Sequence, residues 1–192
     1  MLFLFLFLVF LISAAALWFQ GFWNCLITFI NLILAGLVAM SFYEPLAGVF
    51  PNSMDAMADF VGLWGVFIIA FGVFRIASDM LCRDKVVFNM PVEMTGRSIM
   101  AIWTAWVFIC FTCMSLHMAP LGKEPFNGGF SEPMSASFLG LSPDRQWLAF
   151  TQSRSTGALS GDNEFDPKST FVIKFRQHRV KHEGGGSDSG GS

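Results

Sequence analysis

The first 43 residues of the chain contain no charged side chain. Asp, Glu, Lys and Arg are absent from Met1 to Tyr43, and Glu44 is the first ionic group. Soluble domains carry about 25% charged residues, most of them on the surface, whereas this chain carries 14%. A water-soluble fold could not keep so long a stretch uncharged and stay dispersed. The sequence therefore predicts an integral membrane protein, with lipid around this part of the chain.

Four apolar segments have roughly the length of about 20 residues that a lipid-spanning helix needs. They cover approximately residues 1–19, 22–42, 60–77 and 98–118. Gln20 and Gly21 predict a tight turn and an antiparallel hairpin, Glu44-Pro45 ends the second segment, and Pro120 stops the last. The prediction is an all-α integral membrane protein, a bundle of about four transmembrane helices with a short polar C-terminal tail.

Composition divides the chain into three parts. Residues 1–118 form the predicted transmembrane domain, which keeps its first segment because a cleaved signal peptide would need a basic n-region. Residues 119–183 are predicted to be an extramembrane tail with one short amphipathic helix, which begins after Ser142 and has Trp147 on its apolar side. Residues 184–192 are rich in Gly and Ser and are predicted to be disordered.

Basic residues near the segment ends predict the topology. The connection between the third and fourth segments holds Arg83 and Lys85, whereas the connection between the second and third holds no base. Because Lys and Arg favour the cytoplasmic side, loop 80–96 is predicted to be cytoplasmic and both termini periplasmic, in a bacterial inner membrane. A basic run over 174–181 argues for the opposite orientation, but it lies far from the membrane.

Three polar side chains share one face of the second apolar segment, namely Asn24, Thr28 and Asn31. Exposure of this stripe to hydrocarbon would be costly, so it is predicted to face protein. We expect it either to pack against another helix or to line a pathway in an assembly of several copies.

Arg75 and Asp79 lie one helical turn apart near the end of the third segment and can pair on one face. Two interpretations stay open. The pair could belong to an intramembrane ion pathway, or Arg75 could be a topological anchor that reaches to the interface. Their position at the helix end, and not at its centre, favours the anchor.

The segment 44–51 is too short to cross a bilayer and too apolar for an ordinary water-facing loop. It is predicted to lie in the headgroup zone or to dip slightly inward. Tyr43, Glu44 and Pro45, together with Trp147, are therefore candidate contacts with the interface or with a partner.

Three patterns that could carry chemistry have simpler explanations. Cys110 and Cys113 have thioredoxin-like spacing, but they lie in an apolar segment where lipid disfavours an accessible thiolate. His178 and His182 have metal-ligand spacing without a further ligand to complete the set. The run 187–191 resembles a trypsin-like nucleophile loop, but the tail is too short for that fold. The sequence predicts no catalytic residue, no cofactor and no metal site.

The remaining polar features limit the kinds of partner that the sequence predicts. His117, at the outer end of the last segment, is interpreted as a lone interfacial histidine without a special role. The net charge is −2, and the basic residues form no patch of the kind that follows phosphates, so no nucleic-acid partner is expected. The predicted partners are the lipid bilayer and either a second copy of the chain or another membrane protein.

An ordered set of short features resembles one known family. In the membrane part these are the first apolar segment followed by residues 21–22, the Tyr43-Glu44-Pro45-Leu46 segment, and the third segment running into Arg75. In the tail they are residues 143–150 and 165–167. Together they resemble the colicin V production protein (CvpA) family, in a form with an added C-terminal tail associated with planctomycete-like bacteria.

The resemblance covers about residues 1–118 and implies an inner-membrane protein with about four spans, associated with production or export of the toxin colicin V. Some family members carry a trypsin-like protease after the membrane domain, for which this tail has no room. The expected function is a non-enzymatic scaffold or accessory factor for toxin export or envelope homeostasis. The alternative is a small channel or transporter subunit in which the polar stripe lines a path after oligomerisation.

Overall fold

Five helices make up nearly all of the structure. The computed structural model describes residues 2–47, 55–82, 86, 88–119, 141–155 and 171. Its helices are α1 (Leu2–Trp18), α2 (Phe22–Ala47), α3 (Asp55–Leu81), α4 (Met90–Met118) and α5 (Pro143–Ser155). The predicted all-α membrane fold is confirmed. The Gly/Ser-rich end at 184–192 and the histidine pair His178 and His182 lie outside the described residues.

Three of the helices are long and apolar enough to cross a bilayer, over Phe22–Tyr43, Met57–Leu81 and Met90–Met118. α1 is strongly apolar but has 17 residues. At about 1.5 Å per residue it is ~25 Å long, which is at the lower limit for a span. The structure thus has three full-length candidate spans and one shorter apolar helix beside them, where the sequence predicted about four.

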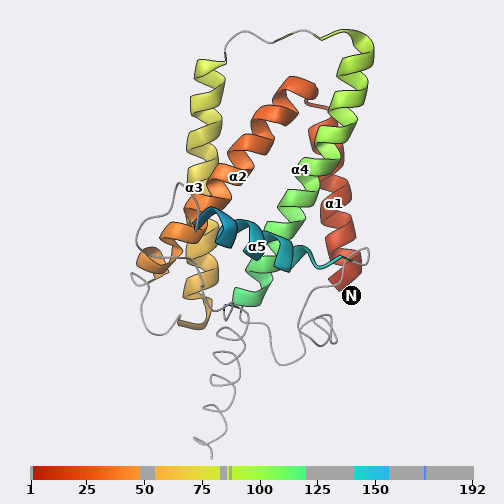
Figure 1. Cartoon of the computed structure of the whole chain (residues 1–192). Coiled ribbons are helices and arrows are strands. Elements are labelled where there is room, and N and C mark those ends of the chain that lie inside the picture. The colour runs from red at the N-terminus through yellow and green to blue at the C-terminus, as the bar shows by residue number, and fades with distance from the viewer. Residues whose placement is uncertain are drawn as a thin grey trace, which may run out of the picture.

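The helices follow one another across the bundle in the order α1, α4, α2, α3 (Figure 1). α2 packs against both α3 and α4, whereas the backbones of α3 and α4 come close at few positions and these two helices meet through aromatic side chains. α5 lies across the bundle on α4 and on neighbouring α2 (Figure 1). The α1–α2 turn, the end of α3 and the start of α4 lie toward one end of the bundle, and the start of α1 lies toward the other (Figure 1).

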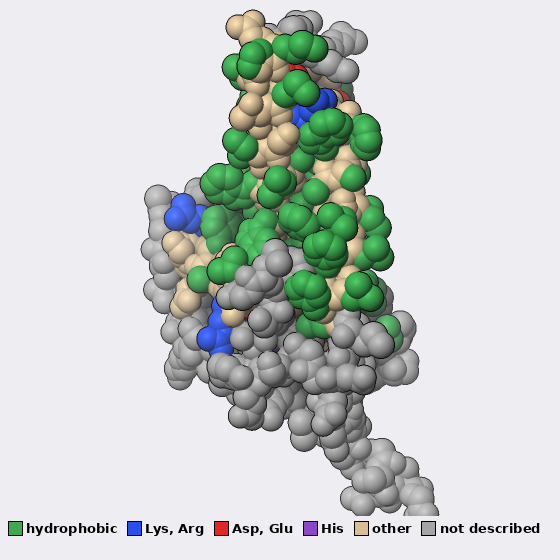
Figure 2. All heavy atoms as spheres, turned by 90° about the vertical axis from the view of Figure 1, so that its right-hand side faces the viewer, with side chains coloured by type: hydrophobic (Ala, Val, Ile, Leu, Met, Phe, Trp, Pro, Cys, Tyr) green, Lys and Arg blue, Asp and Glu red, His purple; other side chains and the backbone are tan. Residues whose placement is uncertain are grey.

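α1 packs mainly on α4 and only weakly on α2, so the predicted α1–α2 hairpin is not the main contact of α1. Leu2 and Leu6 are buried against Ile109 and Cys113 of α4. α4 offers small residues on this side, which lets the helices approach closely. The opposite face of α1 exposes large apolar side chains, namely Phe3, Leu4, Leu8, Leu11 and Ile12. Figure 2 shows such side chains over the helices on this side of the molecule, as expected for contact with lipid.

Aromatic rings fill the main core between α2, α3, α4 and α5. Phe111 of α4 is fully buried, and its ring stacks on Phe67 of α3 at 4.5 Å between centroids. Trp64 of α3 and Trp147 of α5 meet the same ring edge-on at 5.6 Å and 5.3 Å. Offset and edge-on ring pairs add to the dispersion energy of the core. Phe111 therefore joins three helices at one point.

Several helices extend beyond the segments that hydropathy marks. α3 begins at Asp55 instead of about residue 60 and ends at Leu81, and α4 begins at Met90 instead of about 98. α2 continues through Pro45 to Ala47, although Glu44-Pro45 was expected to end it. Hydropathy marks the lipid-facing length, whereas backbone hydrogen bonds can continue into polar turns.

The turn between α1 and α2 depends on Gly21, whose φ is +85°. This left-handed conformation favours glycine because it has no Cβ. A Cβ there would also lie 3.1 Å from Oε1 of Glu93. Glu93 accepts a hydrogen bond from the backbone N–H of Phe22 at 2.8 Å, so a carboxylate of α4 caps the positive N-terminal end of α2.

We expect Gly21→Ala to lower the free energy of unfolding by about 1–2 kcal/mol, because alanine disfavours the left-handed region. The measurement is thermal unfolding of the purified protein in mild detergent. Gly65→Ala is the matched control, since its Cβ would make an ordinary 3.7 Å contact with Leu46 and alanine favours the helix. Equal melting temperatures for the two variants would contradict the prediction.

Candidate functional site

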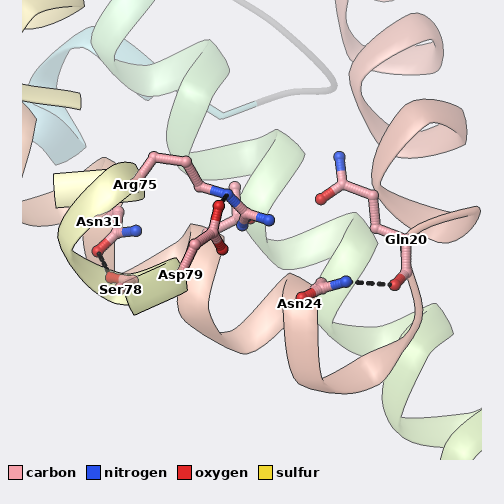
Figure 3. Close-up of polar contacts among 7 residues, drawn as sticks. Gln20, Asn24, Asn31, Arg75, Ser78 and Asp79 are labelled. Carbon is pink, nitrogen blue, oxygen red and sulfur yellow. Dashed lines mark hydrogen bonds and ion pairs between the residues drawn. The ribbon is translucent and has the colours of Figure 1, made fainter. Parts of the chain in front are cut away.

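Polar side chains of α2 and α3 meet inside the bundle at the end that holds the α1–α2 turn (Figure 3). Nη1 of Arg75 donates a hydrogen bond to Oγ1 of Thr28 at 3.2 Å. The hydroxyl of Ser78 donates to Oδ1 of Asn31 at 3.1 Å. Nε of Arg75 pairs with Oδ2 of Asp79 at 3.2 Å. We call these five residues the α2–α3 polar cluster.

Helical periodicity explains why these residues meet. Thr28 and Asn31 are three apart on α2, and Arg75, Ser78 and Asp79 lie within about one turn of α3. α2 and α3 run in opposite directions side by side (Figure 1), and Thr28 and Asn31 each hydrogen-bond a residue of α3. Thr28 and Asn31 are buried, as expected for a polar stripe that lipid would disfavour.

Asn24, the third member of the stripe, is not part of the cluster. Its Nδ2 donates to the backbone carbonyl of Gln20 at 3.0 Å, one turn earlier (Figure 3). The side chain thus satisfies the end of α1 and the α1–α2 turn instead of reaching α3. The structure brings Thr28, Asn31, Arg75 and Asp79 together and leaves Asn24 apart.

The inner side of the α2–α3 polar cluster is buried between the helices, and its outer side is exposed. The buried amide of Asn31 and hydroxyl of Thr28 lie between the helices, whereas the side chains of Arg75 and Asp79 are 30% and 55% exposed. Arg75 therefore contacts both sides, with Nη1 inward on Thr28 and Nε outward on Asp79. The arrangement can hold α3 on α2 and present one cation and one anion at the surface of the bundle.

A second group of polar contacts fixes α5 to the bundle. Nε2 of His117 lies 2.9 Å from Oδ2 of Asp144, and both side chains are fully buried. Oε1 of Gln146 accepts a hydrogen bond from Nε1 of Trp106 at 3.0 Å. We call this group, together with Gly36 and Trp147, the α5 clasp. Gly36 and Trp147 pack against each other without a polar contact.

Trp147 occupies space that only a glycine at position 36 leaves open. An added Cβ on Gly36 would lie 2.5 Å from the Trp147 ring, closer than real Cβ contacts allow. The ring is buried among α2, α4 and α5 and touches Phe111. Close backbone approach is the usual reason for a glycine inside a membrane helix. Gly36 thus leaves the space on α2 into which the Trp147 ring of α5 packs.

Two of the residues expected to contact the interface or a partner are buried within the chain. Tyr43 and Trp147 are both buried in the main core. Pro45 is exposed in the last turn of α2. The side chain of Glu44 lies outside the described residues, as do positions 48–51. The aromatic side of the α5 segment therefore faces the bundle.

The interpretation of His117 as a lone histidine is wrong, because Asp144 pairs with it. Sequence reasoning missed this pair because 27 positions separate its members and no periodicity relates them. Asp144 lies in the first turn of α5, where the helix dipole alone is enough to explain an acidic residue. Gly36 gave no signal beyond its place in an apolar run.

Among the described residues, no group of three His, Cys, Asp or Glu side chains could hold a metal ion. Comparison of the chain with family models, curated proteins and solved structures gives no match. No match identifies the CvpA family, so the resemblance stays a prediction from the residues quoted for it above. Function has to be argued from the geometry of the sites.

We expect His117→Leu to destabilise the protein by about 3–5 kcal/mol, because it leaves the buried carboxylate of Asp144 without this partner. The double variant His117→Leu/Asp144→Leu replaces both buried polar side chains by apolar groups and should recover most of the loss. Thermal unfolding in mild detergent measures both. Labelling of Cys110, which lies 3.8 Å from Gln146, reports whether α5 has left the bundle. A double variant as unstable as the single one would contradict this account.

Proposed function

We propose that the chain is a non-enzymatic, multi-pass membrane scaffold or accessory protein. The observation that carries this proposal is that Thr28 and Asn31, the buried polar groups of α2, are bonded to α3. Hydrogen bonds between membrane helices contribute about 0.6–2 kcal/mol each, so they fix helix positions. Polar groups used in this way keep the helices in fixed positions relative to one another, as a scaffold requires.

The α5 clasp supports the same function. A helix after the last candidate span is held on the bundle by the buried contact between His117 and Asp144 and by the packing of Trp147 on Gly36. Its outer face exposes Arg145 and Arg154. A rigid framework with a polar helix fixed on one face suits a protein that positions another protein at the membrane.

The resemblance to the CvpA family supplies the biological setting of the proposal. We infer an inner-membrane location and a role in toxin production or export, or in envelope homeostasis. Neither the α2–α3 polar cluster nor the α5 clasp contains a nucleophile with a base positioned to activate it, which favours a supporting role.

A channel or transporter subunit is the second candidate. The observation that favours it is the exposure of Arg75 and Asp79 on the outer side of the α2–α3 polar cluster. Because this side faces away from the bundle, a path along it would require several copies of the chain. The hollow between α2 and α3, of about 580 Å3, is lined by apolar side chains such as Val38, Ile69 and Phe74, which does not favour passage of ions.

The two candidates differ in ion or solute flux through proteoliposomes. A scaffold should give no flux above that of empty liposomes, and Asn31→Leu should lower stability by about 1 kcal/mol because Ser78 loses its acceptor. Asn24→Leu is the matched control, since its amide bonds only to the carbonyl one turn earlier. Flux through the unaltered chain that Asn31→Leu abolishes, with folding intact, would favour the pathway.

We further propose that loop 80–96 is cytoplasmic and both termini periplasmic. Cys82 is a natural reporter, because it is exposed after α3 whereas the other three cysteines are buried. A membrane-impermeant thiol reagent should leave Cys82 unlabelled in intact cells and label it after lysis. Ser187→Cys, in a chain that also carries Cys82→Ser, should be labelled in intact cells. The reverse pattern would invert the proposed topology.

A further inference from the structure

α3 is the least covered of the three long helices. In the most apolar stretch of each helix, the share that is buried within the chain is 17% for α3, 44% for α2 and 56% for α4. Its outward face carries Ile68, Ile69 and Ile76, each more than half exposed. Gly72 lies among them, and an added Cβ there would meet nothing within 4 Å. This face is open to lipid or to another protein.

The same face ends in the exposed part of the α2–α3 polar cluster. The Asp79 side chain is 55% exposed although Arg75 pairs with it. Asp79 lies near the end of α3, and any protein surface that covers it would exclude water and headgroups from the rest of this carboxylate, which is costly without a new partner. A covering surface should therefore offer a cation to Asp79 and an anion to Arg75.

A second copy of α3 meets this requirement. It presents one cation and one anion on one turn, so two copies related by a two-fold axis are complementary in charge. A guanidinium has five N–H donors, and Arg75 uses one on Thr28 and one on its own Asp79, so donors remain for a second carboxylate.

The spacing of the residues also fits a parallel helix pair. Positions 68, 72, 75 and 79 follow the alternating steps of four and three residues that form the seam of a left-handed coiled coil. Gly72 allows the two backbones to approach closely at the centre of this seam. Ile68 would add apolar contact on one side of Gly72, and the charged residues would pair on the other.

We propose that the outward face of α3 is a homodimer interface, in which Gly72 lies at the closest approach and Arg75 of each copy pairs with Asp79 of the other. The dimer would cover the exposed ion pair and join two frameworks side by side. This inference goes beyond the proposed function and is independent of it, since scaffold and channel subunit alike could use the interface.

Disulfide trapping in membranes tests the position of the interface. In a chain with the exposed Cys82 changed to Ser, Gly72→Cys and Ile76→Cys should form disulfide-linked dimers on oxidation. Ile102→Cys, on an exposed face of α4, is the matched control and should stay at the background level. Equal crosslinking at the α3 and α4 positions would overturn the proposal, as would no crosslinking at either α3 position.

Charge variants test the pairing between copies separately from pairing within one copy. Asp79→Arg leaves two cations on the turn and Arg75→Asp leaves two anions, so each variant alone loses both kinds of pair. Self-association, measured by co-purification of two differently tagged copies in mild detergent, should fall about tenfold for each. Co-expression of the two variants should restore association, because each then meets the opposite charge.

The recovery in the mixture is the decisive result, because a purely structural defect within each copy would persist there. Elution of each variant as a single folded species in size-exclusion chromatography checks the fold. Association of each variant as strong as that of the unaltered chain would mean that lipid headgroups cover the charges, and would overturn the proposal. A mixture that associates no better than its components would overturn it as well.

Discussion

In hydrocarbon, every polar group must find its partner within the protein, and this constraint shapes the molecule from backbone to side chain. Helices satisfy the backbone, which is why the described residues are almost all helical. Buried polar side chains then meet at helix contacts: Thr28 with Arg75, His117 with Asp144, and Glu93 with the backbone of Phe22. Large apolar side chains fill the outer surfaces. The helix order follows from these few directional contacts more than from apolar surface, because lipid solvates apolar surface equally well.

α5 shows how a polar segment becomes part of a membrane bundle. Its outer side is polar, yet Trp147 and Asp144 insert among α2 and α4. Two conditions make this possible: Gly36 leaves room for the indole ring, and His117 compensates the buried carboxylate. The contact between His117 and Asp144 fixes the start of α5 and thereby the position of the Trp147 ring three residues later, so the two conditions act together. The tail segment 143–155 is consequently packed in the same core as α2, α3 and α4.

Features that depend on local spacing could be predicted from the sequence, and those that depend on the path of the chain could not. Hydrophobic runs predict the helices of the membrane part, and the spacing of Arg75 and Asp79 predicts their pair, because one helical turn relates them. Helix ends were missed because hydropathy reports lipid contact and not hydrogen bonding. The packing of α1 on α4, and of His117 on Asp144, joins distant positions, so no local pattern encodes it.

Arg75 links the interior of the bundle to its outer surface. The same guanidinium holds Thr28 of α2 and the partly exposed Asp79, so the orientation of α3 on α2 and the position of the outward charge are set together. α3 packs mainly on α2, and most of its apolar stretch is uncovered. A partner that binds Asp79 from outside must therefore also change the balance of forces that holds α3 to α2. In this way a contact made at the surface of one helix would reach the buried polar cluster through a single side chain.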